Sequence, residues 1–351
     1  MNFWSKSVIY SDYISKSRLD IYEKHLKVQP SQVIAAYHWN KALSGAMLPA
    51  FQCLEVTLRN AINSAILSHP PKGSKGLWTP NNNWITDLPR YIGNSKIKPI
   101  ERYKRATLTK HRQDIHGYLL DQYGNRILAR KVKEENLIQQ AKELISKEGK
   151  KPTPDRIISG LTFGFWVHLL TSIYEDTHGY RLLWPNLTPI VFPNAPMGYE
   201  RSTIHEAFVR IKTLRNRLSH HEAIWKFHYD DPYTGKPNYK TPIYGAHASC
   251  NLLRKHYDDI LDMIGWINSD RKNTFLKYSA NLRFYALCSV KGLNSYIDPD
   301  KISTKVNISR GGRGIRKLLK VLGRNDFIRL TKSNETILTI GADNSMKIKN
   351  I

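Results

Sequence analysis

The residues best suited to chemistry lie in one short stretch, IKTLRNRLSHHEAIW, which runs from Ile211 to Trp225. Within it, Arg215 and Asn216 are followed by His220 after three further residues. Histidine can exchange a proton near neutral pH, and arginine offers phosphate oxygens a permanently charged, planar set of donors. RNA cleavage needs both functions, because the 2′-hydroxyl loses a proton, the 5′-oxygen gains one and charge develops on the phosphorane. Such a site requires no metal.

The spacing limits how these side chains can meet. On an ideal helix Asn216 and His220 share a face, whereas Arg215 and His220 point about 140° apart. A distorted helix end could unite the arginine and the histidine, and so could a two-fold dimer in which each protomer supplies one motif. The alternative without chemistry is a basic helix whose C-terminal histidines interact favourably with the helix dipole.

Helical periodicity dominates the chain up to about residue 270 and must position these residues. Apolar residues at spacings of three and four predict a core-facing helix over residues 32–67, bent or divided near Gly45 and Pro49. Further helices are predicted over residues 128–148, 202–218 and 247–266. The uncharged segment 157–174 is too polar and too sharply bounded by charges for a membrane span, and predicts a helix in the core or in a subunit contact.

The charge balance points to a polyanionic partner. The 351 residues include 54 Lys and Arg against 29 Asp and Glu, a net charge of +25, in a composition normal for a globular protein. The surplus is dense at residues 96–151, with a net +8, and at residues 271–351, with a net +12. The candidates for binding RNA in these regions are Lys131, Lys133, Arg310, Arg313, Arg316 and Lys317.

Cysteine usage indicates a reducing compartment. Cys53, Cys250 and Cys288 are far apart in sequence and form no CxxC pair, which argues against a disulfide framework and against a zinc site. We therefore expect no metal and no cofactor. The N-terminal residues lack the apolar run of a secretory signal, so we expect a cytoplasmic protein without a membrane partner.

The segment RNRLSHHEAIW resembles the R-N-x-x-x-H signature of the HEPN superfamily, as found in Abi-like (AbiD/AbiF-type) abortive infection proteins. Three earlier parts of the chain resemble the same family, in the family's order. They are SRLDIY from Ser17, YHWNKALSGA from Tyr37 with LEVTLRNAI from Leu54, and LTFGFWVHLL from Leu161. Together these matches cover roughly residues 13–265, and the tail from Arg271 resembles nothing further.

The resemblance implies a mainly α fold, namely a HEPN-type helical bundle with inserted loops. We place this domain at residues 1–270, with a basic helical insertion at about 96–151. A small basic extension with an α+β pattern follows at residues 271–351. The resemblance also implies a homodimer and a metal-independent endoribonuclease that leaves a 2′,3′-cyclic phosphate in antiviral defence.

The family's roles carry over residue by residue. Arg215 would stabilise transition-state charge, Asn216 would orient, and His220 would transfer protons. Candidates to support them are His221, Glu222, Glu55 and Arg59. For the first two, the alternative is a solvated helix end. For Glu55 and Arg59, which are four residues apart on one helix, it is an internal ion pair.

Three functions remain open at this stage. The first is the endoribonuclease, acting as a toxin on an RNA target, with a small non-coding RNA or an antitoxin as a further partner. The second is a non-catalytic RNA-binding module that holds a small non-coding or antitoxin RNA. The third is a protein-interaction subunit that meets its partner through residues 157–174.

Overall fold

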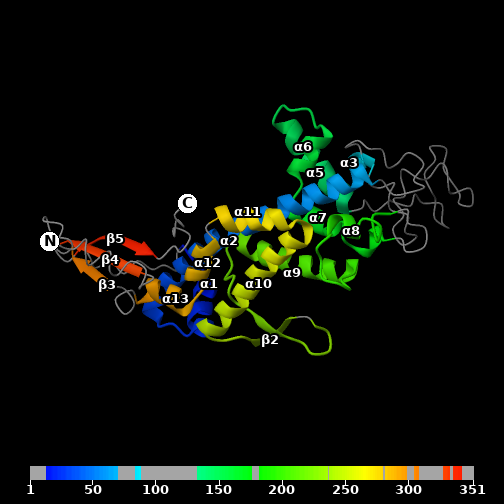
Figure 1. Ribbon diagram of the computed structural model, residues 1–351. Helices are drawn as coiled ribbons and strands as arrows, with labels where there is room; N and C mark the ends of the chain where they lie inside the picture. The colour runs from blue at the N-terminus through cyan, green and yellow to red at the C-terminus, as the bar shows by residue number, and fades with distance from the viewer. Residues whose placement is uncertain are drawn as a thin grey trace, which may run out of the picture. The chain divides into compact units, whose positions relative to one another are not determined.

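The computed structural model describes residues 13–69, 84–87, 133–175, 182–235, 237–279, 281–298, 304–307, 327–332 and 335–341. The prediction of a mainly helical protein is confirmed (Figure 1). The helices are α1 (Lys16–Ile21), α2 (Val33–Ser68), α3 (Trp84–Asp87), α5 (Lys133–Lys147), α6 (Pro154–Gly160), α7 (Phe163–His168), α8 (Thr188–Val191), α9 (Arg201–Ser219), α10 (Ala246–Ile267), α11 (Ser269–Tyr278), α12 (Asn281–Leu287) and α13 (Val290–Ile297). Shorter helical turns are a π-helical turn at Tyr22–Leu26 and 3₁₀ turns at Pro30–Gln32 and Ser172–Tyr174.

The described strands form two small sheets. The strands are β1 (His228–Asp230), β2 (Pro237–Pro242), β3 (Thr304–Asn307), β4 (Phe327–Lys332) and β5 (Glu335–Gly341). The first two pair as an antiparallel hairpin, while β3 pairs parallel and β5 pairs antiparallel with the central β4. The tail thus contains helices followed by strands, in agreement with the predicted α+β pattern of the extension.

The chain divides into two compact units. Unit 1 contains Met1–Gln52, Thr213–Asp262 and Asn273–Ile351, and unit 2 contains Cys53–Lys212 and Met263–Lys272. The long helices α2, α9 and α10 contribute residues to both units, so each unit is assembled from separate stretches of sequence. The domain boundary expected at residue 270 remains a prediction.

Helix α2 is a single helix of 36 residues, so the segment is not divided near Pro49, and the bend expected as the alternative stays a prediction. Proline removes one backbone donor, and its ring crowds the carbonyl four residues earlier. That position is Gly45, and both residues are exposed. We infer that water can solvate the released carbonyl there, which lets the helix continue to Ser68.

Unit 1 has an aromatic core that includes the start of the tail. Trp39 is fully buried on α2, and its indole N–H donates to the carbonyl of Leu287 at 2.8 Å. Tyr257 of α10 stacks on Phe284 of α12 with ring centroids 4.0 Å apart. The helices at residues 281–297 therefore belong to this core.

Unit 2 buries the uncharged segment, as predicted, although not as one helix. The backbone is extended at Leu161 and Thr162, which separates α6 from α7, and a 3₁₀ turn follows. Phe165 and Trp166 are fully buried in this unit. The interior of the protein thus already covers these apolar side chains, which disfavours the hypothesis that they form an external docking face.

One carboxylate–imidazole contact in unit 2 links α5 to α7. Glu134 is buried, and its carboxylate lies 2.8 Å from Nε2 of His168.

Within the described ranges, no helix is both long enough and apolar enough to cross a bilayer.

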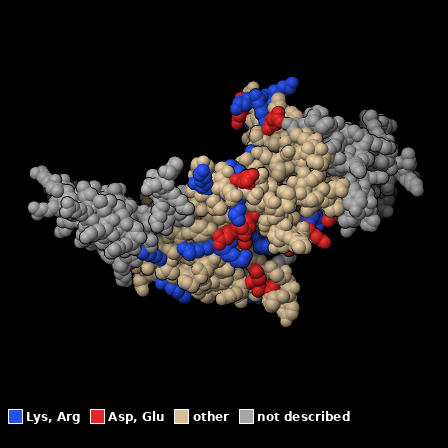
Figure 2. Space-filling model, in the orientation of Figure 1, with Lys and Arg blue, Asp and Glu red and all other residues tan. Residues whose placement is uncertain are grey.

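On the face shown in Figure 2, described Lys and Arg side chains lie among Asp and Glu side chains. The net charge of +25 therefore does not form one continuous basic surface on this face.

Candidate functional site

The motif lies where helix α9 ends. The backbone stays helical through His220, whose N–H donates to the carbonyl of Asn216 at 2.9 Å. Because this turn is regular, the side chains of Arg215 and His220 leave the helix in directions about 140° apart. The distorted helix end that would have united them within one chain is not observed.

A left-handed residue stops the helix directly after His220. His221 has φ 55°, its N–H donates to the carbonyl of Leu218 at 3.1 Å, and the N–H of Glu222 donates to that of Arg217 at 2.9 Å. This pair of bonds is a Schellman motif, in which glycine is the usual left-handed residue. His220 and His221 thus occupy the end of the helix and the turn that stops it.

The side chains of the three predicted catalytic residues face outward. Asn216 and His220 are exposed and Arg215 is half-buried. Their side chains form no hydrogen bond or ion pair with other residues in the described part of the chain. The hydrogen bonds that these residues form within the protein involve their main-chain atoms. The carbonyl of Arg215, for example, accepts from Ser219 Oγ at 3.1 Å. The three side chains are therefore available to a ligand or to a second protomer.

Asn40 of α2 fixes the chain that follows the turn. Its side chain is 1% exposed, donates to the carbonyl of Glu222 at 3.1 Å and accepts from the N–H of Ile224 at 3.1 Å. Next to this bridge, Trp225 is fully buried against Tyr22, with ring centroids 5.2 Å apart. The end of α9 is thus anchored to the core of unit 1.

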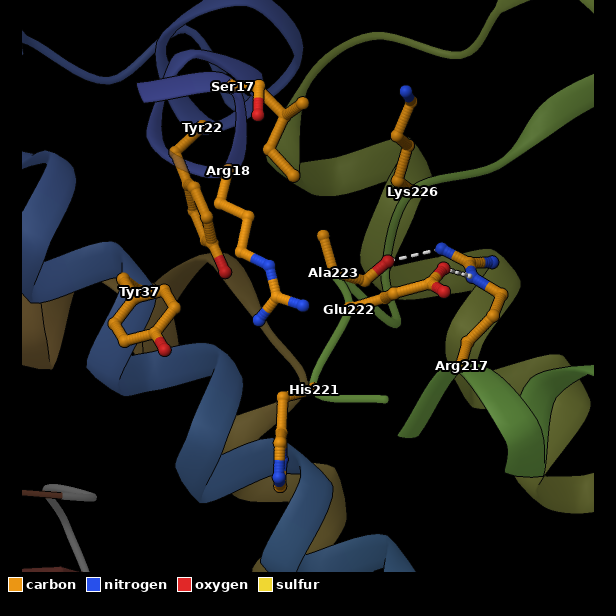
Figure 3. A pocket seen from close by; sticks show the side chains of 10 residues that line it. Ser17, Arg18, Tyr22, Tyr37, Arg217, His221, Glu222, Ala223 and Lys226 are labelled. Carbon is orange, nitrogen blue, oxygen red and sulfur yellow. Dashed lines mark hydrogen bonds and ion pairs between the residues drawn. The ribbon is translucent and has the colours of Figure 1, made fainter. Parts of the chain in front are cut away.

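A pocket of about 160 Å³ lies beside the turn, and we call it the Arg18 pocket (Figure 3). It is lined by Ser17, Arg18, Ile21, Tyr22, Tyr37, Arg217, His221, Glu222, Ala223 and Lys226. In Figure 3 the Arg18 guanidinium extends from α1 toward the turn, and Arg217 approaches the turn from the opposite side. Arg18 Nη2 also donates to the carbonyl of His220 at 3.3 Å, so the pocket is connected directly to the motif.

The pocket has a surplus of positive charge. Arg18, Arg217 and Lys226 contribute three cations, against the single carboxylate of Glu222. That carboxylate faces Arg217, with Oε2 3.7 Å from Nε, and the Arg217 guanidinium also donates to the carbonyl of Ala223.

Burial lowers the pKa of the Arg217 guanidinium from its ordinary value, and the Glu222 carboxylate opposes that shift. The pKa of Lys226 is also lowered, by burial first and then by the charge of Arg217. These cations repel one another, which makes the pocket a favourable place for an anion.

The supporting residues predicted from the sequence fall into two groups. His221 and Glu222 line the Arg18 pocket, and Glu222 pairs with Arg217. Glu55 and Arg59 belong to unit 2, where Arg59 donates to the carbonyl of Ser159 at 3.2 Å. A catalytic role for any of these four residues remains a prediction.

Of the predicted RNA-binding residues, Lys133 is exposed at the first position of α5. Lys131, Arg310, Arg313, Arg316 and Lys317 lie outside the described residues.

Sequence reasoning missed four residues of this site. Arg18 and Asn40 occur in segments that carry the family resemblance, yet their residue types gave no role by themselves. Arg217 sits inside the motif, and Lys226 follows it directly. For Arg18, Asn40 and Arg217, the only available signal was their location in the segments that resemble the family.

Across the part of the chain that the structure describes, no three His, Cys, Asp or Glu side chains are grouped so as to hold a metal ion.

The structure defines a class of protein, namely a helical protein whose R-N-x-x-x-H motif ends a helix beside a basic pocket. The chain belongs to the Abi-like protein family, whose model matches residues 3–226. This match includes the motif and every residue that lines the Arg18 pocket. Membership of the family indicates a role in abortive infection. No curated protein and no solved structure matches the chain.

Proposed function

We propose that this protein is a metal-independent endoribonuclease of the HEPN type, which acts as a toxin in abortive infection and antiviral defence. The observation that carries the proposal is the end of helix α9, where Arg215, Asn216 and His220 present side chains without partners in the described part of the chain. An arginine and a histidine in this setting supply the phosphate donor and the proton carrier that RNA cleavage requires.

The proposed reaction is an internal transesterification. His220 takes the proton of a 2′-hydroxyl, and the resulting 2′-oxygen attacks the adjacent phosphorus. Arg215 stabilises the charge of the phosphorane, and Asn216 holds the phosphate or the imidazole. The 5′-oxygen then leaves with a proton from a second acid, giving a 2′,3′-cyclic phosphate and a 5′-hydroxyl.

A homodimer would supply that second acid. In a two-fold dimer built on the exposed ends of two α9 helices, each protomer contributes one motif to a common cleft. The separation of Arg215 and His220 around α9 supports this arrangement, because neither side chain has to reach around its own helix. The partners in the proposal are therefore target RNA and a second copy of the chain. A small non-coding RNA or an antitoxin would restrain the toxin.

The test is cleavage of RNA by the purified protein in EDTA. We expect wild-type protein to cleave and to leave 2′,3′-cyclic phosphate ends. We expect His220→Ala to lower the rate by about 10²–10⁴-fold, the usual contribution of general acid–base catalysis. Arg215→Ala should also lose activity. His247→Ala, which removes an exposed histidine from α10, is the matched control and should cleave like wild type. Equal cleavage by all four proteins would contradict the proposal.

A second candidate function is an RNA-binding module without turnover. It is favoured by the tyrosines that follow the motif around the β1–β2 hairpin, because Tyr229 is 62% exposed, Tyr233 95% and Tyr239 79%. Exposed aromatic rings can stack on unpaired bases, at about 1–3 kcal/mol per base. RNA binding that persists in His220→Ala, without cleavage under any condition, would favour this candidate. Sequencing the nucleic acid that copurifies with the protein would identify the bound RNA in either case.

A further inference from the structure

The Arg18 pocket lies next to the groups to which the proposed chemistry is assigned, and that chemistry uses none of its lining side chains directly. Arg18 approaches the motif only through the main chain, by its bond to the carbonyl of His220. The proposed reaction therefore does not explain why these charged side chains gather in the pocket.

The cations of the pocket are only partly neutralised. Glu222 is already engaged with Arg217. Arg18 and Lys226 form no ion pair with any residue in the described ranges, although Lys226 is influenced electrostatically by Glu222. The Arg18 guanidinium has five N–H donors and spends one on the His220 carbonyl, which leaves donors that can hold a second acceptor. A planar guanidinium with donors to spare suits an anion with several oxygens.

The size of the pocket limits the ligand to a small group. About 160 Å³ is well below the roughly 300–1,000 Å³ of sites that enclose a drug-sized ligand. A phosphate group fits this space while the sugar and base attached to it stay outside. The hydroxyl of Ser17, which lines the pocket, can donate a hydrogen bond to an oxygen of such a group.

The positive field continues from the pocket toward the β1–β2 hairpin. Burial lowers the pKa of His228 of β1, and the charges of Lys226 and Arg217 lower it further. Tyr239 of β2 lies beside His228, with ring centroids 5.1 Å apart. A chain of phosphates that leaves the pocket in this direction would meet the exposed rings of Tyr229 and Tyr239.

We propose that the Arg18 pocket binds a phosphate of the RNA strand on which His220 acts, at a position away from the scissile bond. Arg18 donates hydrogen bonds to the phosphate oxygens from its remaining N–H groups, and the positive charge of Lys226 attracts the phosphate. Arg18 also holds the helix end through the His220 carbonyl, so the same side chain connects the bound strand to the motif. This inference rests on the proposed function in taking RNA as the ligand.

The test measures RNA affinity in a His220→Ala background, where turnover does not interfere. The probe is a short unstructured RNA followed by fluorescence anisotropy at several salt concentrations. We expect Arg18→Ala to weaken binding about tenfold or more, since a hydrogen bond to a charged group is lost. The slope of log K against log salt should fall by about 0.7 for one lost phosphate contact. Arg18→Lys keeps the charge without the planar fork and should give an intermediate affinity.

The matched control is Lys16→Ala, which removes one positive charge from the same helix but does not line the pocket. Lys226→Ala tests the opposite wall, and it also keeps the inference testable if Arg18→Ala folds poorly. Two RNAs of the same sequence, the first with a 5′-phosphate and the second with a 5′-hydroxyl, distinguish the source of the phosphate. An equal loss on both RNAs assigns the pocket to an internal phosphodiester, and a loss confined to the first assigns it to a terminal phosphate.

Binding by Arg18→Ala and Lys226→Ala that matches Lys16→Ala would overturn the inference. If His220-dependent cleavage persists in that case, only the pocket assignment fails. If wild-type protein binds RNA through Arg18 but never cleaves it, the phosphate site stands and the nuclease proposal fails.

Discussion

Asn40 determines the path of the chain beyond the motif through two hydrogen bonds from one buried amide. Replacing it with alanine leaves the carbonyl of Glu222 and the N–H of Ile224 without this partner, and each unpaired buried group costs about 1–3 kcal/mol. We expect Asn40→Ala to lower the free energy of unfolding by about 2–4 kcal/mol. Urea denaturation followed by circular dichroism would measure the loss.

Ser44→Ala is the control for this prediction. Its hydroxyl is part-buried on the same helix and donates only to the carbonyl of Asn40, a bond within the helix. Its removal should change the free energy of unfolding much less. Equal losses in the two variants would mean that the amide bridge does not hold the turn.

The same residues mark how far the sequence could predict the site. Arg215, Asn216 and His220 are within six positions of one another, and their helix has a clear periodicity, so both motif and helix could be predicted. Arg18 and Asn40 meet the turn from 202 and 182 residues away. No local spacing encodes such contacts, because they depend on how the helices pack.

At the scale of elements, Pro49 in the middle of helix α2 lowers the stability of the helix. Proline in a helix interior is about 3 kcal/mol less favourable than alanine, and Pro49 is exposed, so its replacement sacrifices little packing. We expect Pro49→Ala to raise the free energy of unfolding by about 1–3 kcal/mol, measured by urea denaturation.

Gly45→Ala is a second stabilising change for comparison. Gly45 has no neighbouring atom within 4 Å of an added Cβ, and alanine should gain about 1 kcal/mol in a helix. A loss of stability in Pro49→Ala would mean that the proline fits a local geometry that alanine disturbs.

Element boundaries were the least predictable part of the fold. The helix predicted over residues 157–174 is interrupted because Leu161 and Thr162 adopt extended backbone. The sequence marks that break only by Gly160 and Thr162, residue types that are common at helix ends and helix starts. The helix over 247–266 was predicted closely, since α10 has a continuous apolar stripe from Ala246 to Ile267.

At the scale of the whole molecule, both units contain histidines that resist protonation. The pKa values of His25, His205 and His228 are lowered, in each case first by burial and then by nearby cations. The unfolded chain, with ordinary histidine pKa values near 6.5, therefore binds protons before the folded chain does. The stability from these groups is fully present above pH 6.5 and is lost as the pH falls below it.

We expect the melting temperature to decrease on acidification below about pH 6.5. His25→Gln should reduce the steepness of that decrease, because His25 is buried against Tyr244 with ring centroids 5.3 Å apart. Differential scanning fluorimetry between pH 5 and 8 would measure it. An identical pH profile in wild type and His25→Gln would contradict the assignment to this residue.

The proposed dimer predicts that one inactive copy also inactivates its partner. If cleavage needs His220 from both protomers, one as base and one as acid, a dimer of wild-type and His220→Ala protein is inactive. Random exchange at equal concentrations makes half of the dimers mixed, so activity should fall to about half of that shown by the same amount of wild-type protein alone. The measurement is RNA cleavage after the two proteins are mixed and allowed to exchange. Unchanged activity, despite exchange shown by differently tagged copies, would argue against a shared site.

The order of the segments in unit 1 also sets when the protein can act during its own synthesis. Arg18 leaves the ribosome 202 residues ahead of His220. At about 5–20 residues per second, this interval lasts about 10–40 s. During this interval the nascent chain contains Arg18 but not yet the complete Arg215–His220 motif. If the protein is the toxin proposed above, it therefore cannot act on the ribosome and message that produce it until more than half of the chain has been made.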